Sequence, residues 1–263
     1  MLTVGLNVVQ GSANVAAVVS IGASLTAMIY ALGPVSGAHL NPAVTVAVSL
    51  RSSSFGTGNA VAYMGSQLLG GVLAGLSYYL LSTFQSFPLG SAEGYPLTHW
   101  PIVDSWFGVA LAEFVFTFVL CYVVLATATA SMAAKDIFGL AIGFSVSVAS
   151  SSFRSSAVLA PVTLPHDTNS RDVCSCVVQV IVGGYAIGPI SGGSLNPAVS
   201  FAVDFVHLLA NSVKGQFHAR FWHCFVYGAV ELLAGAAAAL VFMVTHPEDM
   251  AYVSADEEAS KFV

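Results

Sequence analysis

Two asparagines stand inside a repeated stretch of this chain. Residues 33–44 read GPVSGAHLNPAV and residues 188–199 read GPISGGSLNPAV, so Asn41 and Asn196 occupy the same place in the two copies. A side-chain amide can donate hydrogen bonds and can cap a helix, and the proline that follows suits a first helical turn. The side-chain amides of Asn41 and Asn196 can therefore donate hydrogen bonds at the start of two short helices.

Other reactive residues do not form a catalytic or metal-binding pattern. Cys174 and Cys176 form a CxC motif with His166 nearby, but a metal site needs more ligands. Cys121 and Cys224 lie in apolar spans, where cysteine behaves as a small hydrophobic residue. The sequence contains no nucleophile–base pair, phosphate loop or basic patch. We therefore expect no enzymatic activity, no cofactor and no nucleic-acid partner.

The composition points to a membrane protein. The 263 residues are 56% hydrophobic and 8% charged, with a mean hydropathy of +0.82, whereas soluble domains carry about 25% charged residues. The apolar runs are continuous over about 20 residues, as in transmembrane helices, and do not alternate as barrel strands do. We expect an all-α polytopic membrane protein. Its predicted apolar spans are 14–32, 58–82, 106–129, 137–148 and 221–243, the fourth being too short to cross alone.

The two copies of the repeat are too polar to be membrane spans. Each contains Pro, Gly and Asn, and each predicts a re-entrant loop followed by a short helix, at 41–50 and 196–206. Irregular backbone at membrane depth is tolerated only where it is buried in protein or lines a watery cavity. Two such segments in corresponding halves predict an inverted repeat with the functional site between them.

The register of the repeat predicts the domain organisation. We expect one transmembrane domain over 1–243, with repeat one at 1–82 and repeat two at 106–243, followed by an acidic tail at 244–263. The internal match fails before Tyr185 and returns only if about 149–182 are skipped. That insert is either a retained intron or a species-specific loop, and we favour the intron because the insert interrupts a helix. The partner of span 106–129 would begin before Met1, so we also expect most of a first transmembrane helix to be absent.

The residues resemble those of the aquaporins, the major intrinsic protein family. The resemblance rests on the two Asn-Pro-Ala boxes in a repeat, the AEFVFTF segment that begins at Ala112, and Gln67. It implies six transmembrane helices plus two half-helices that meet at mid-membrane, and a homotetramer with one pore per subunit. The implied pore motifs are Asn41, Pro42, Ala43, Asn196, Pro197 and Ala198. Their paired amides would orient a water oxygen, and the positive helix ends would repel cations.

The resemblance also implies a selectivity filter, and here the chain departs from the common pattern. Most aquaporins have an arginine after the second box, where this chain has Val199. The register places the four filter positions at Ile21, Gly184, Gly193 and Val199. None is aromatic, histidine or charged, so we expect a wide filter that passes water and small uncharged solutes such as glycerol, urea or ammonia. The run NPAVSF resembles tonoplast members, which favours a vacuolar membrane over the plasma membrane.

Several further residues are expected to support the loops. His39 is expected to brace the first loop by hydrogen bonds, and Gln67 belongs to the same resemblance. Glu113 resembles a buried family glutamate that supports the re-entrant loops. Glu231, inside the last span, has either a functional role or a buried structural one at a helix contact. Asp204, which ends the second predicted short helix, is expected to be solvated or to cap rather than to line the pore.

The leading prediction is a passive channel, with water, small neutral solutes and the lipid bilayer as partners. Two alternatives stay open at this stage. One is a structural or adhesion membrane protein with a closed pore. The other is a non-functional product, since one helix is expected to be missing and another to be interrupted.

Overall fold

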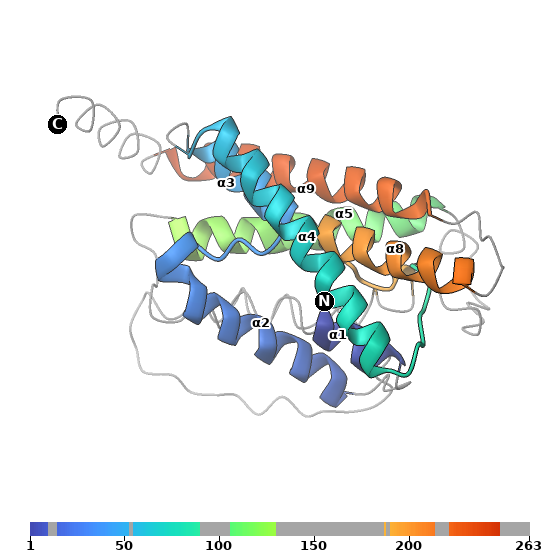
Figure 1. Cartoon of the computed structure of the whole chain (residues 1–263). Helices are drawn as coiled ribbons and strands as arrows, with labels where there is room; N and C mark the ends of the chain where they lie inside the picture. The colour runs from blue at the N-terminus through green and yellow to red at the C-terminus, as the bar shows by residue number, and fades with distance from the viewer. Residues whose placement is uncertain are drawn as a thin grey trace, which may run out of the picture.

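The computed structural model describes residues 1–9, 15–52, 55–89, 106–129, 187, 190–213 and 221–247. All regular secondary structure in these ranges is helical, and none of them forms a strand (Figure 1). The prediction of an all-α fold is therefore confirmed for the described part of the chain. The Cys174, Cys176 and His166 group, the span at 137–148, the insert at 149–182 and the acidic tail beyond 247 lie outside it.

The described helices are α1 (Leu2–Val9), α2 (Val15–Ser36), α3 (Pro42–Arg51), α4 (Thr57–Leu81), α5 (Trp106–Val124), the π-helical turn η2 (Leu125–Thr129), α8 (Pro197–Val213) and α9 (His223–Thr245). Within the described residues, three helices are long and apolar enough to cross a membrane: α4, the continuous helix Trp106–Thr129, and α9. They coincide with the predicted spans 58–82, 106–129 and 221–243 to within two residues. The predicted span 14–32 is also helical, as α2, but continues through Pro34 to Ser36.

The two short helices begin where the sequence predicts. Asn41 is the N-cap of α3 in extended conformation, and Pro42 is its first helical residue. Pro197 likewise opens α8 after Asn196. The end of α8 differs from the prediction, because the helix continues seven residues past Val206 to Val213. Its buried stripe of Val203, Val206 and Ala210 continues at helical spacing, so packing extends the helix beyond the repeat.

The short helix of each half packs against a long helix of the other half. The most extensive helix contacts are α5 with α9, α3 with α9, and α4 with α8. Thus α4 of the first half packs on the short helix of the second, and α9 of the second half packs on the short helix of the first (Figure 1). Glycines allow this approach: a Cβ on Gly71 would lie 2.8 Å from the Ala198 carbonyl oxygen, and one on Gly75 would lie 2.9 Å from Val206 Cγ2.

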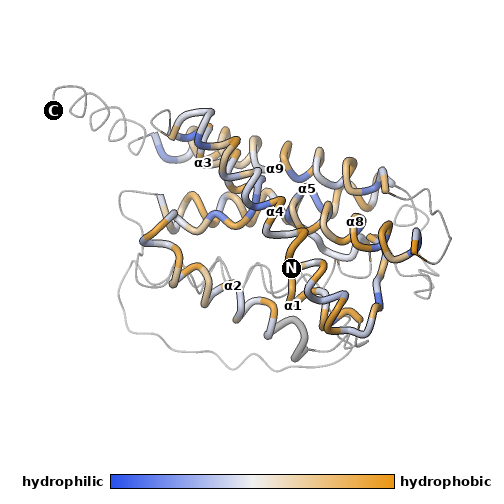
Figure 2. Tube along the Cα trace, in the orientation of Figure 1, coloured by the Kyte–Doolittle hydropathy of each residue, from blue (hydrophilic) through white to orange (hydrophobic). Residues whose placement is uncertain are grey.

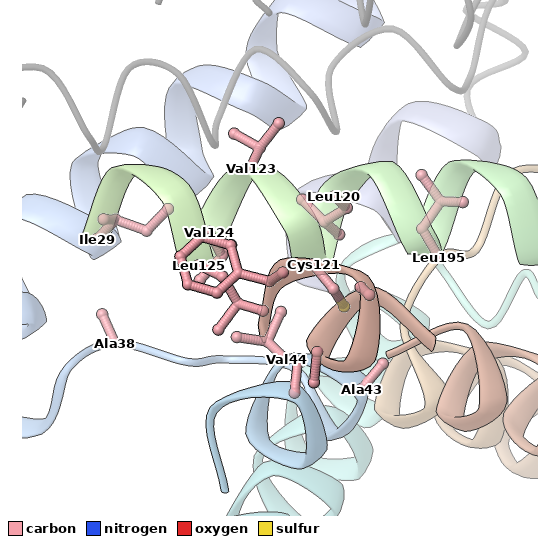
Figure 3. Close-up of a cluster of buried hydrophobic side chains, with 14 of the residues drawn as sticks. Ile29, Ala38, Ala43, Val44, Leu120, Cys121, Val123, Val124, Leu125 and Leu195 are labelled. Atoms are coloured by element: carbon pink, nitrogen blue, oxygen red, sulfur yellow. The ribbon is translucent and has the colours of Figure 1, made fainter. Parts of the chain in front are cut away.

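The main buried cluster lies between α3, α5 and α9. Val44, Leu120, Cys121, Val124 and Phe242 are among its members, and Figure 3 labels the first four. Apolar residues also cover the outside of the helix bundle, and Figure 2 shows apolar colour on most of the described helices. Large apolar side chains are exposed on α4, α5 and α9, including Leu69, Leu73, Phe107, Leu233 and Leu240. An apolar core inside an apolar exterior is typical of helices in lipid, because lipid does not select for polar surface.

Candidate functional site

The asparagines of the two repeated motifs contact each other's loops. Asn41 Nδ2 donates to the Leu195 carbonyl oxygen at 2.8 Å, and Asn196 Nδ2 donates to the Leu40 carbonyl oxygen at 3.0 Å. The partners stand 154 and 156 positions apart in the chain. Each amide nitrogen carries two hydrogens, and these bonds use one of each pair. Each amide nitrogen therefore has a second hydrogen that can donate to a third group.

The other end of each amide caps a helix. Asn41 Oδ1 accepts from Ala43 N at 2.9 Å, and Asn196 Oδ1 accepts from Ala198 N at 3.0 Å. The oxygen of each amide therefore faces its own helix and the nitrogen faces the opposite loop. This network fixes the orientation of both amides. It also brings the N-terminal ends of α3 and α8, which carry partial positive charge, toward each other.

The two loops share an unusual backbone as well as a sequence. Gly37 and Gly192 have positive φ, at 71° and 85°. Leu40 and Leu195, one residue before each asparagine, also have positive φ, at 51° and 55°. Such a conformation costs a residue with a side chain about 1–2 kcal/mol. Because the strained leucines are the ones whose carbonyls accept from the asparagines, the cross-loop bonds are the contacts that offset this cost.

The first loop is held by a neutral polar network. Thr45 Oγ1 lies at its centre, where it donates to the Asn41 carbonyl at 3.1 Å and accepts from Gln67 Nε2 at 2.9 Å. His39 Nδ1 lies 3.3 Å from the same hydroxyl. The imidazole also packs against Phe55 and Tyr63, each with a centroid distance of 5.3 Å. His39 thus contacts the hydroxyl at the centre of the first loop, and its role as a brace stays a prediction.

The second loop is held by two buried carboxylates. Glu113 on α5 is 1% exposed, and its oxygens accept from Ser194 N at 3.1 Å and Leu195 N at 2.9 Å. Glu231 on α9 is fully buried and accepts from Asn196 N at 2.9 Å. Three consecutive backbone N–H groups therefore end on carboxylates. Hydrogen bonds of this kind offset the cost of burying the two carboxyl groups. Glu113 thus contacts the second loop at two backbone N–H groups, and its role as a loop support stays a prediction.

The four predicted filter positions are only partly described. Ile21 is buried on α2, and Gly193 lies in the second loop with φ of 64°. Val199 is half-buried on the first turn of α8 and packs against a cluster that includes Cys224 and Tyr227. Gly184 lies outside the described residues. The filter as a set of four residues therefore stays a prediction.

Asp204 has a role that the sequence analysis left open. Its side chain is 3% exposed, so the solvated alternative is wrong. Oδ1 accepts from Leu89 N at 3.1 Å and Oδ2 accepts from Cys224 N at 3.0 Å. Asp204 therefore caps the first turn of α9, a helix other than its own, where the N-cap residue Trp222 makes no side-chain cap bond. No local pattern could show this, since Leu89 stands 115 positions away.

Among the described residues, no three His, Cys, Asp or Glu side chains are grouped so that they could hold a metal ion. The free cysteines Cys121 and Cys224 are both buried. The chemistry of the described site is hydrogen bonding from fixed amides.

Comparison with known proteins gives a consistent match. The model of the family described as major intrinsic protein matches residues 2–157. Aquaporin-B of Dictyostelium discoideum is 34% identical over 193 residues, which cover 71% of this chain and 60% of that protein. Nodulin-26 of Glycine max is 29% identical over 188 residues, covering 71% and 53%, and the probable aquaporin NIP4-2 of Arabidopsis thaliana is 30% identical over 185 residues, covering 70% and 50%. The matched chain thus spans between half and three fifths of these relatives. The resemblance to tonoplast members stays a prediction.

Proposed function

Because the chain belongs to the major intrinsic protein family, we propose that it is a passive transmembrane channel for water and small uncharged solutes, with its narrow centre at the two Asn-Pro-Ala loops. The observation that carries this proposal is the reciprocal bonding of Asn41 to Leu195 and of Asn196 to Leu40. It supports a centre at which both amides are held in one orientation. The family and the apolar helices make the chain an integral membrane protein.

The geometry suggests how such a centre passes water without passing protons. The free hydrogens of Asn41 Nδ2 and Asn196 Nδ2 donate to the oxygen of a passing water. A water held through its oxygen directs both of its own hydrogens away from the centre, so its neighbours cannot relay a proton through it. The positive ends of α3 and α8 add an electrostatic barrier to cations.

The proposed filter is wide and apolar, formed by Ile21, Gly184, Gly193 and Val199. Without an arginine, it lacks a charged side chain that would narrow the opening and donate hydrogen bonds. Glycerol, urea and ammonia are therefore proposed as solutes beside water. We further propose a homotetramer in a vacuole-type membrane, on the family resemblance and the NPAVSF run.

The test is stopped-flow measurement of volume changes in proteoliposomes that contain the full chain. The wild type is compared with Val199→Arg and with Val213→Arg, a control at the 84%-exposed end of the same helix. We expect fast water flux and urea or glycerol entry in the wild type and the control. In Val199→Arg, solute entry should fall by about tenfold, which corresponds to about 1.4 kcal/mol of added barrier.

Other results would change the proposal in defined ways. Water flux without solute entry in the wild type would retain the channel but contradict the wide filter. An absence of both fluxes from correctly inserted protein would contradict the channel and favour a structural protein with a closed pore.

A further inference from the structure

Glu231 and Gln67 occupy corresponding positions of the internal repeat. Gln67 on α4 stands four residues before Gly71, and Glu231 on α9 stands four residues before Gly235. Both glycines make the same close contact with the opposite half. A Cβ on Gly71 would meet the Ala198 carbonyl, and one on Gly235 would clash with the Ala43 carbonyl. The correspondence of the two helices is thus structural and does not depend on sequence similarity between them.

The partners of the two side chains also correspond. Gln67 bonds to the hydroxyl of Thr45, which stands four residues after Asn41. Glu231 bonds to the hydroxyl of Ser200, which stands four residues after Asn196 and donates to its two carboxylate oxygens at 3.2 and 3.3 Å. Each half therefore has a long polar side chain, from the described helix that follows its short helix, on the hydroxyl of that short helix.

The two halves differ in what this side chain holds. Glu231 Oε1 also accepts the backbone N–H of Asn196 itself, at 2.9 Å, beside the Glu113 bonds to Ser194 and Leu195. Glu231 is buried and accepts from the Ser200 hydroxyl, whereas the Gln67 amide donates to the Thr45 hydroxyl. The residue that carries the pore donor of the second half is thus tied to α9 through its own backbone.

We propose that Glu231 is a positioning residue of the channel, which holds the Asn196 backbone so that the side-chain amide faces Leu40 and the passing oxygen. The effect of Glu231 on transport rests on the proposed function, whereas its contact with Asn196 does not. Its essential chemistry is an acceptor for Asn196 N–H. Glutamine can supply that acceptor and can donate to Ser200 as Gln67 does to Thr45, whereas leucine fills similar space with neither.

The transport test compares Glu231→Gln, Glu231→Leu and the control Leu233→Ala, a 64%-exposed position on the same helix. Water permeability and proton leak are measured per inserted channel in proteoliposomes, so that loss of folded protein is separated from altered conduction. We expect Glu231→Gln and the control to match the wild type. In Glu231→Leu, water permeability should fall by about tenfold and proton leak should rise, because the buried N–H loses its acceptor and the Asn196 donor is no longer fixed.

Two transport results would overturn the proposal. Wild-type behaviour of Glu231→Leu would show that Asn196 is positioned without Glu231. Equal damage in Glu231→Gln and Glu231→Leu would show that an acceptor at this position is not sufficient to hold Asn196.

A second measurement does not depend on conduction. Hydrogen–deuterium exchange of the full chain in nanodiscs reports the protection of the backbone N–H groups at 194–200. We expect exchange there to accelerate by about tenfold in Glu231→Leu and to stay unchanged in Glu231→Gln, with the first loop unaffected in both. Unchanged exchange in Glu231→Leu would overturn the inference. If the wild type carries no water, the proposed function fails, and exchange alone decides whether Glu231 holds Asn196.

Discussion

At the scale of single residues, Asp204 joins three segments that are separate in the chain. Its carboxylate on α8 accepts from Leu89, which follows α4, and from Cys224 in the first turn of α9. A carboxylate at a helix N-terminus satisfies N–H groups that the helix leaves unpaired, and its charge suits the positive end of the helix. Asp204 therefore stabilises the packing of α8 against the start of α9.

Replacing Asp204 by asparagine tests this role with little change in shape. The asparagine side chain has one acceptor oxygen where aspartate has two, so either Leu89 N or Cys224 N loses its partner. We expect Asp204→Asn to lower the free energy of unfolding by about 1–3 kcal/mol, the cost of a buried unsatisfied donor. Thermal unfolding in detergent measures it. The control Ser212→Ala removes a hydroxyl that donates to the Leu208 carbonyl of the same helix. A stability of Asp204→Asn equal to that of the control would exclude the capping role.

At the scale of helices, small residues determine how closely α4 and α8 approach. Gly71 faces the Ala198 backbone and Gly75 faces Val206, both without room for a Cβ. Gly70, next to Gly71, is exposed and would have nothing within 4 Å of an added Cβ. Substitutions at Gly70 and Gly71 can therefore separate the effect of close packing from the intrinsic effect of glycine in a helix.

Alanine substitutions at Gly71 and Gly70 are expected to have opposite effects on stability. Gly71→Ala should destabilise the protein by about 1–3 kcal/mol, because the backbone carbonyl of Ala198 cannot move aside without shifting α8. Gly70→Ala should be neutral or slightly stabilising, since alanine is the better helix former by about 1 kcal/mol. Thermal unfolding in detergent and water flux are both measured. Equal stability of the two variants would contradict the close α4–α8 packing.

At the scale of the whole molecule, the open question is the predicted insert at 149–182. The family match ends at residue 157, inside this segment, and the second Asn-Pro-Ala motif lies beyond the match. Yet the second motif bonds to the first at both asparagines. The two halves therefore complete one site, whichever origin the intervening segment has.

Peptide mass spectrometry of the native protein distinguishes the two origins. Trypsin cleavage after Arg154 and Arg171 releases residues 155–171, and cleavage after Lys214 and Arg220 releases residues 215–220. If the segment is a retained intron, the peptide 155–171 should be absent while the control peptide 215–220 is found. Detection of both at similar abundance would show that the segment is a genuine part of the protein.

Much of this fold could be predicted because its signals are local. Membrane-crossing helices depend on the length of an apolar run, so three spans were located to within two residues. A helix start depends on a cap and a first-turn proline, so Asn41 and Asn196 marked α3 and α8. The end of α8 at Val213 could not be predicted from the sequence repeat. The helix extends beyond the repeat because its residues are buried against other helices.

The helical class and the two short helices follow from the sequence alone, because each depends on residues a few positions apart. The packing of the helices sets which groups the Asn41 and Asn196 amides meet and what holds them. The Leu40 and Leu195 carbonyls, the two carboxylates behind Asn196, and the capping of α9 by Asp204 all join separate segments. A buried hydrogen bond requires both partners at a fixed distance and angle, and for distant segments only the packing of the helices supplies that geometry.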